Sequence, residues 1–228
     1  DRERAFLPRI ERIATRFPRL RIVIEHISSA ETVAALASLP PTVGATVTVH
    51  HLLLTLDDVI GDELRPHHFC KPVAKRPADR DAICAAVLSG NRRVFFGSDS
   101  APHARGDKES DCGCAGVYTA PVAVPLLAEF FDRAGVALTE RRTRPEEGSS
   151  PGYVSRLADE PSLEAFVSQY GAEFYRLPRN ERTITLVESE TVVPGEYDGV
   201  VPFRAGTSLR YDVADADAEQ REESHEHG

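Results

Sequence analysis

The chain has 228 residues, of which 41% are hydrophobic and 28% are charged, which is enough for one sizeable α/β core. Its formal net charge of −9 at pH 7 argues against nucleic-acid binding, and no apolar run approaches the roughly 20 residues that a membrane helix needs. The four cysteines do not suggest a disulfide framework, so we expect a reduced, cytoplasmic protein with neither nucleic acid nor a membrane as partner.

Helix-like and strand-like segments alternate over 2–134. Apolar residues recur at helical spacing in some segments and form short β-branched runs in others, and Pro18, Pro40 and Gly90 mark ends. In chain order we expect a helix over 2–17, a strand over 21–27, a helix over 30–39, a strand over 44–51, an irregular segment over 52–77, a helix over 78–90, a strand over 92–99 and a helix over 121–134. This alternation predicts a parallel α/β sheet with three core strands.

The remainder of the chain is less regular. Segment 139–161 is polar and rich in Pro, Gly and Arg, so we expect a mobile insertion there. A helix is expected over 162–175, followed by short strands or extended segments over 182–211. The segment 212–228 is acidic and poor in apolar residues, which predicts a disordered tail whose two histidines are not expected to bind metal. Residues 1–211 are therefore expected to form one unit.

Polar side chains end two of the expected strands. Because alternate strand residues share a face, His26 ends an apolar stripe that includes Ile24, and Asp99 ends one that includes Phe95 and Gly97. Polar residues at the carboxyl ends of inward-facing stripes are typical of an α/β barrel active site, and both residue types bind zinc. The alternatives are a structural histidine at the first position and a helix cap or turn at the second.

Other histidines and charged residues are weaker candidates. Four histidines are expected to be structural or to support metal ligands: His50, His51, His67 and His68. Cys112 and Cys114 are separated by one residue, which is too few for an ordinary zinc site, so we interpret them as thiols lining a loop. A small zinc-binding interaction module is therefore the least favoured function. Arg105, Lys108 and Glu109 could serve an anionic substrate, but a solvated charged loop is the default interpretation.

Three strings in the sequence carry a resemblance to a known family. They are "IEHIS" (24–28), "RPHHFCKPVAKRPADRDA" (65–82) and "GSDSAPHARGDKESDCGCAGVYTAPVA" (97–123). Together they resemble dihydroorotases of the single-function bacterial and fungal type, which belong to the amidohydrolase superfamily. The likeness runs from near residue 1 to about residue 135, and it resumes more weakly at "FYRLP" (174–178) and "VPFRAG" (201–206).

The resemblance implies a fold and a reaction. The fold is a (β/α)8 barrel of the TIM type, of which this chain would hold the last three core strands and their helices, with a C-terminal extension of short strands. The reaction is the interconversion of L-dihydroorotate and N-carbamoyl-L-aspartate in pyrimidine biosynthesis. The cofactor is a pair of metal ions, usually zinc, and the partner is the small-molecule substrate. A homodimer of the complete enzyme is left open.

The resemblance also implies roles for five residues. His26 resembles a histidine ligand of one metal, and Asp99 resembles the aspartate that binds the other metal and acts as general acid and base. His103 resembles the residue that holds the substrate carboxylate, and Ala115 would donate its backbone N–H to the same carboxylate. Lys71 stands where the family uses backbone groups against the substrate ring.

Several expected features of the family are missing. The His-x-His pair, the carboxylated lysine that bridges the metals and one further histidine have no counterpart here, and the chain contains no methionine. We therefore expect the C-terminal part of a dihydroorotase, which holds two metal ligands and is inactive alone. Two alternatives remain: a non-catalytic fragment or scaffold that resembles a dihydroorotase, and another cyclic amidohydrolase such as a hydantoinase-like ring opener.

Overall fold

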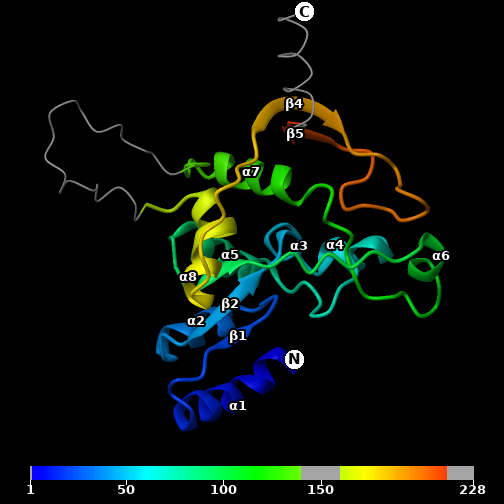
Figure 1. Cartoon of the computed structure of the whole chain (residues 1–228). Coiled ribbons are helices and arrows are strands. Elements are labelled where there is room, and N and C mark those ends of the chain that lie inside the picture. Colours follow the sequence, from blue (N-terminus) through cyan, green and yellow to red (C-terminus); the bar gives the residue numbers. More distant parts are fainter. Residues whose placement is uncertain (1, 140–159, 215–228) are drawn as a thin grey trace, which may run out of the picture.

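The computed structural model describes residues 2–139 and 160–214. Its centre is a parallel sheet in the order β1 (Ile22–Ile24), β2 (Val43–Val47) and β3 (Val94–Phe96), with helices packed around it (Figure 1). The helical elements are α1 (Arg2–Arg16), α2 (Ala30–Ser38), α3 (Val49–Leu53), α4 (Asp57–Ile60), the 3-10 turn η1 (Pro66–His68), α5 (Pro77–Leu88), α6 (Arg105–Lys108), α7 (Ala123–Arg133), the π-helical segment η3 (Ala165–Gln169) and α8 (Tyr170–Tyr175). The predicted parallel α/β arrangement is confirmed for the described residues.

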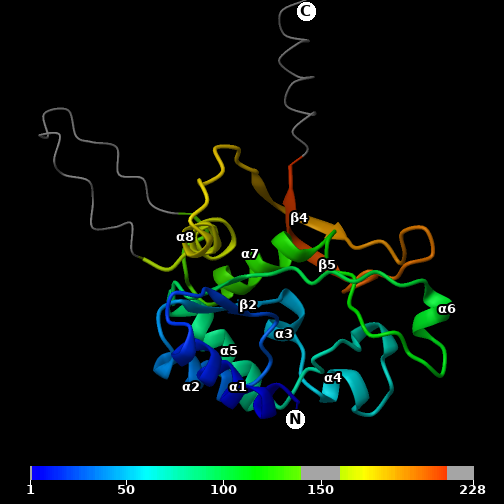
Figure 2. The ribbon, with the colours of Figure 1, turned by 60° about the horizontal axis from the view of Figure 1, so that its bottom comes forward.

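A second, two-stranded sheet lies over α7 (Figure 2). Its strands β4 (Leu186–Val192) and β5 (Ser208–Val213) are antiparallel, which confirms the expected extended segments. Asp212 pairs with Val187 in this sheet, so the start of the expected disordered tail is instead a strand. The rest of that expected tail from 215 on, and 140–159 of the expected insertion, lie outside the described residues.

The two faces of the parallel sheet differ from the expected arrangement. The register places Ile24 beside Ala45 and Ala45 beside Val94, so these side chains share one face within the main hydrophobic cluster. Phe95 lies on the other face, where its ring packs 5.5 Å from that of Phe174 in α8. The stripes of Ile24 and Phe95 therefore face opposite sides, and the prediction that both point inward is wrong. The register between strands determines which face of the sheet each side chain lies on, and the periodicity within a single strand does not reveal that register.

The middle strand ends earlier than predicted. Thr48 caps α3, because its hydroxyl oxygen accepts a hydrogen bond from the backbone N–H of His51 at 3.1 Å. His50 and His51 therefore lie in a short helix rather than at the end of a strand. The segment 52–77, expected to be irregular, also contains α4 and η1.

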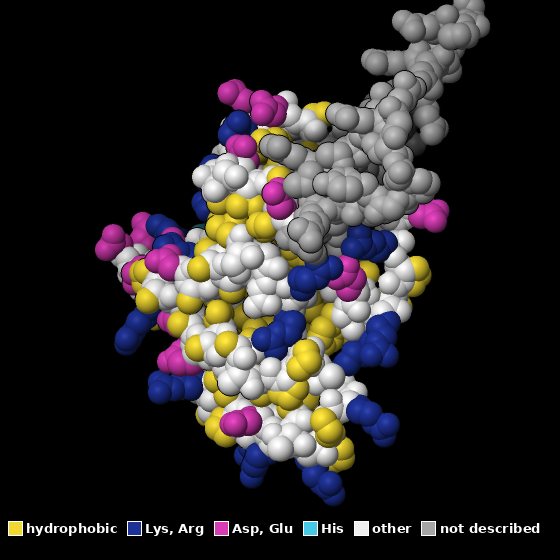
Figure 3. Space-filling view, turned by 90° about the vertical axis from the view of Figure 1, so that its left-hand side faces the viewer, with side chains coloured by type: hydrophobic (Ala, Val, Ile, Leu, Met, Phe, Trp, Pro, Cys, Tyr) yellow, Lys and Arg dark blue, Asp and Glu magenta, His cyan; other side chains and the backbone are white. Residues whose placement is uncertain are grey.

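The surface of the described part mixes polar and apolar side chains. On the face drawn in Figure 3, apolar side chains lie between charged ones of both signs. The helix α1 buries Ile10 and Ala14 and exposes Phe6 and Ile13. No helix in the described ranges is long and apolar enough to cross a membrane.

Candidate functional site

The two predicted metal ligands share an unusual backbone conformation. His26 has φ 42° and Asp99 has φ 38°, which is the left-handed region that residues other than glycine seldom adopt. Each residue follows the end of its strand, β1 or β3, so its side-chain direction is set by this turn and not by strand alternation. Such conformations cost about 1–3 kcal/mol each and cluster at functional sites.

Thr46 of the middle strand brings the two turns together. Its hydroxyl accepts a hydrogen bond from the backbone N–H of His26 at 2.7 Å. Gly97 lies against the same side chain, since a Cβ atom there would meet the Cβ of Thr46 at 2.7 Å. Gly97, two residues before Asp99, therefore leaves room for the close approach of the Thr46 side chain.

The electrostatic environment also connects the two candidates. Desolvation raises the pKa of the Asp99 carboxyl, His26 acts against this increase, and Glu25 adds to it. The Nδ1 atom of His26 is buried and has no hydrogen-bond partner in the described part of the chain. A buried ring nitrogen without a partner is unusual in a protein, and it is the donor that a metal ion would use.

His26 and Asp99 are of residue types that bind metal ions, but two ligands are fewer than a catalytic metal site needs. His26 and Asp99 offer one nitrogen and one carboxylate, whereas a catalytic zinc normally takes three protein ligands. Their roles as ligands stay predictions.

Two loops meet beside Asp99, and they carry the predicted substrate residues. The Nε2 atom of His103 donates to the carbonyl oxygen of Ala115 at 3.1 Å, and the N–H of Gly116 donates to the carbonyl oxygen of Phe69 at 2.9 Å. His103 and Ala115 are therefore in direct contact. Lys71 belongs to the segment that follows Phe69, and with His26 it lines a cavity of about 1100 Å³. Asp99, His103 and Ala115 do not line that cavity.

Gly116 allows the loops to approach one another. A Cβ atom at this position would lie 2.6 Å from the carbonyl oxygen of Ala101 and 2.9 Å from Cδ2 of His103. Both distances are far below van der Waals contact, so only glycine fits without displacement of one loop. The N–H of Ala101 in turn donates to the carbonyl oxygen of Val117 at 3.1 Å.

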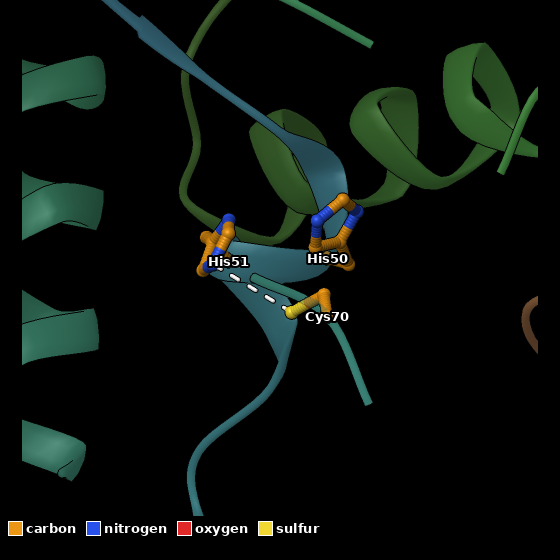
Figure 4. A group of neighbouring side chains, drawn as sticks. All are labelled: His50, His51 and Cys70. Carbon is orange, nitrogen blue, oxygen red and sulfur yellow. Dashed lines mark hydrogen bonds between the residues drawn. The ribbon is translucent and has the colours of Figure 1, made fainter. Parts of the chain in front are cut away.

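His50, His51 and Cys70 form a buried group in which one potential metal-binding atom of each lies within 4.8 Å of the others (Figure 4). Both ring nitrogens of His51 are already used. Nε2 donates to the carbonyl oxygen of Pro72 at 2.9 Å, so Nδ1 accepts from the hydroxyl of Thr48 at 2.8 Å. Burial lowers the pKa of His51 to about 4 and raises that of Cys70 to about 11. For His51, a neutral ring with both nitrogens hydrogen-bonded favours the expected structural role. His50 differs, because both of its ring nitrogens are buried and have no hydrogen-bond partner among the described residues.

Sequence reasoning did not name Glu3 and did not predict the burial of Lys108. The Glu3 carboxylate accepts hydrogen bonds from Ser29 and Thr32 at 2.7 and 2.6 Å, and Lys75 donates to it at 3.1 Å. Lys108 was expected in a solvated loop but is only 3% exposed, so that interpretation is wrong. Its place in the string "KES" was the available signal, because the resemblance includes that string.

The chain is similar to curated proteins that are named dihydroorotase. No family model matches the chain. A curated Shewanella denitrificans protein named dihydroorotase is 42% identical over 218 residues, which cover 93% of this chain and 57% of that protein. The chain thus spans a little more than half the length of the curated relatives it matches.

Solved structures give the same result. The dihydroorotase of Campylobacter jejuni superposes with a TM-score of 0.74 at 38% identity, covering 92% of this chain and 56% of that one. The dihydroorotase of Saccharomyces cerevisiae, solved in complex with 5-fluoroorotic acid, gives 0.74 at 33% identity with the same coverage. A D-hydantoinase from Thermus sp. gives 0.60 at 12% identity over 92% of this chain and 46% of that one, which is a likeness of fold alone.

Proposed function

This chain is a homologue of the dihydroorotases, which are amidohydrolases, and from that premise we propose that the protein containing it interconverts L-dihydroorotate and N-carbamoyl-L-aspartate. The three parallel strands would form part of a (β/α)8 barrel. The observation that carries the proposal is the pairing of His26 and Asp99. Both have a left-handed backbone, His26 bonds to Thr46 while Gly97 of the turn before Asp99 packs against it, and the buried Nδ1 of His26 has no partner in the described residues.

His26 and Asp99 would hold zinc, together with ligands beyond those described. When bound, zinc would polarise the ring amide and make a water molecule more acidic. Asp99 would accept the proton of that water and pass it to the leaving nitrogen, which is general acid–base catalysis by one carboxylate. The four cysteines are free thiols, in agreement with a reducing, cytoplasmic location.

The substrate carboxylate would be bound by His103 together with the backbone N–H of Ala115. The Ala115 carbonyl oxygen occupies Nε2 of His103, and because a carbonyl only accepts, that nitrogen carries a proton. Nδ1 is therefore the ring atom left for the substrate, and it donates to a carboxylate when the ring is protonated. The backbone N–H of Ala115 would be the second donor, and Lys71 would border the substrate ring.

The proposal is tested by Asp99→Asn in the protein that contains this chain. An amide cannot carry the proton, so turnover of dihydroorotate should fall by roughly 10²–10⁴-fold. Asp111→Asn is the matched control, because Asp111 is an exposed aspartate of the neighbouring loop and should leave turnover unchanged. An Asp99→Asn protein that keeps more than about a tenth of the activity would show that another group moves the proton.

A panel of substrates separates the alternatives. Hydrolysis of hydantoin with no turnover of dihydroorotate would establish a different cyclic amidohydrolase. A protein that binds zinc and folds but opens neither ring would be a non-catalytic relative. We expect dihydroorotate to be the preferred substrate, because identity to the dihydroorotases named above is 33–42% and identity to the Thermus hydantoinase is 12%.

A further inference from the structure

Lys108, at the end of α6, is a buried cation surrounded by backbone carbonyl groups. Its Nζ donates to the carbonyl oxygens of Phe69 at 3.0 Å, Cys114 at 2.7 Å and Gly116 at 2.6 Å. An ammonium group has three N–H donors, so these three bonds use all of them. No carboxylate among the described residues forms an ion pair with it, which is rare for a lysine that is 3% exposed.

The three carbonyl groups come from two loops that are far apart in the sequence. Phe69 precedes the segment with Lys71, and Cys114 and Gly116 flank Ala115. Apart from the lysine, the N–H of Gly116 links these loops by its bond to the carbonyl oxygen of Phe69. Lys108 therefore connects the two stretches of backbone that the proposed function assigns to the substrate.

The bond to Cys114 also fixes the direction of the next N–H. In a trans peptide the C=O of one residue and the N–H of the next point in opposite directions. Because the Cys114 carbonyl points at Lys108, the N–H of Ala115 points away from it. The following peptide is held separately, since the carbonyl of Ala115 accepts from His103. Lys108 thus holds the peptide group before Ala115, and His103 holds the peptide group after it.

We propose that Lys108 is a positioning residue for the substrate carboxylate. Its ammonium group orients the peptide between Cys114 and Ala115 and polarises it, so that the Ala115 N–H becomes a stronger donor. A neutral side chain of the same length would fill the space but supply neither effect. This inference rests on the proposed function, because it takes the carboxylate site at Ala115 and His103 as given.

The test compares Lys108→Met with Arg105→Met in the protein that contains this chain. Arg105 is an exposed cation of the same helix, so its variant controls for loss of one positive charge. Lys108→Met should raise the KM for dihydroorotate and the Kd for orotate at least tenfold, with a smaller change in kcat and unchanged zinc content. Arg105→Met should leave the KM, the Kd for orotate, kcat and the zinc content within twofold of the wild-type values. Equal losses in kcat and zinc content would mean a structural role and would overturn the proposal.

A second measurement needs no variant. The given sequence has Cys–Ala peptides at 84–85 and 114–115, so ¹³C-cysteine and ¹⁵N-alanine labelling makes the Ala85 and Ala115 amide signals observable. Orotate should shift the Ala115 signal in a saturable manner and leave the Ala85 signal as an internal reference. If orotate binds and the Ala115 signal does not move, the proposal is wrong even where Lys108→Met fails to fold. If the wild-type protein neither binds orotate nor opens dihydroorotate, the proposed function itself has failed.

Discussion

Two buried charges support the loops that follow the parallel strands, and they are stabilised in different ways. The Glu3 cluster comprises the carboxylate of Glu3, three hydroxyl groups and Lys75, so a negative charge meets a positive one. The Lys108 cluster comprises the ammonium group and three carbonyl dipoles, without an opposite charge in the described residues. The first arrangement is typical of a stabilising interaction, whereas the second buries an uncompensated charge.

The pKa directions express this difference. Burial alone raises the pKa of Glu3, but hydrogen bonds from Ser28, Thr32 and Ser29 and the charge of Lys75 outweigh it and lower the pKa to about 2. Burial lowers the pKa of Lys108. A lowered pKa favours the charged form of an acid and disfavours that of a base. Folding therefore gains from the ionisation of Glu3 and loses from that of Lys108, which suggests that Lys108 is retained for its local effect on the loops.

The largest expected effect is that of Glu3→Gln. It leaves the Lys75 ammonium without its carboxylate in a site where the two side chains are only 18% and 10% exposed. The free energy of unfolding at pH 7 should fall by about 3 kcal/mol, as expected when one partner of a buried pair is removed. Urea denaturation measures this, with Glu11→Gln on the exposed face of α1 as the control. A loss no greater than that of the control would show that the Glu3 cluster contributes no stability.

The same variant should remove part of the acid sensitivity. The folded pKa of Glu3, about 2, lies below its ordinary value of 4.5, so its contribution is complete above pH 4.5 and is lost as the pH falls towards 2. The difference between wild type and Glu3→Gln should therefore shrink over this range. A difference that stays constant between pH 5 and pH 3 would contradict the assignment.

The next effect concerns Gly116, whose carbonyl belongs to the Lys108 cluster. Gly116→Ala places a methyl group against Ala101 and His103, and the loops must separate to accommodate it. We expect a loss of about 1–3 kcal/mol in the free energy of unfolding, the usual cost of overpacking. Gly106→Ala is the control, since a Cβ there meets nothing within 4 Å. Thermal melting of the two variants side by side decides the outcome, and equal midpoints would mean that the loops adjust freely.

The parallel sheet shows which features of the fold could be predicted from the sequence and which could not. Periodicity predicted the parallel strands, and the polar ends of two strands indicated His26 and Asp99. Periodicity could not predict the register that places Ile24 and Phe95 on opposite faces, nor the cap at Thr48 that turns His50 and His51 into a helix. The register depends on contacts between segments that are distant in the chain. The cap is a local contact between residues three positions apart, which strand periodicity does not take into account.

The candidate site shows the same limit. The resemblance indicated His103 and Ala115, and the structure places them in contact. The burial of Lys108 was not predicted, because a charged residue beside Arg105 and Glu109 is normally solvated. Lys108 is buried because the backbones of Phe69 and Gly116 come together around its ammonium group. This contact between distant segments is visible only in the tertiary structure.

The smallest expected effect is the pH dependence of Lys108→Met. The folded pKa of Lys108 lies below its ordinary value, so the cost of burying its charge is complete at neutral pH and declines as the pH rises towards 10.5. The wild type should therefore gain stability relative to Lys108→Met as the pH rises from 7 to 9.

The neighbouring thiols do not obscure this difference. Burial raises the pKa of both Cys70 and Cys114, that of Cys70 to about 11, so the Cys70 thiol stays largely protonated up to pH 9. Urea denaturation of both proteins at pH 7, 8 and 9 isolates the contribution of the lysine, since all other groups are shared. A wild type that instead loses stability relative to the variant as the pH rises would mean that Lys108 has a raised pKa and a compensating negative partner. The contrast with Glu3 would then disappear, because both clusters would be ion pairs.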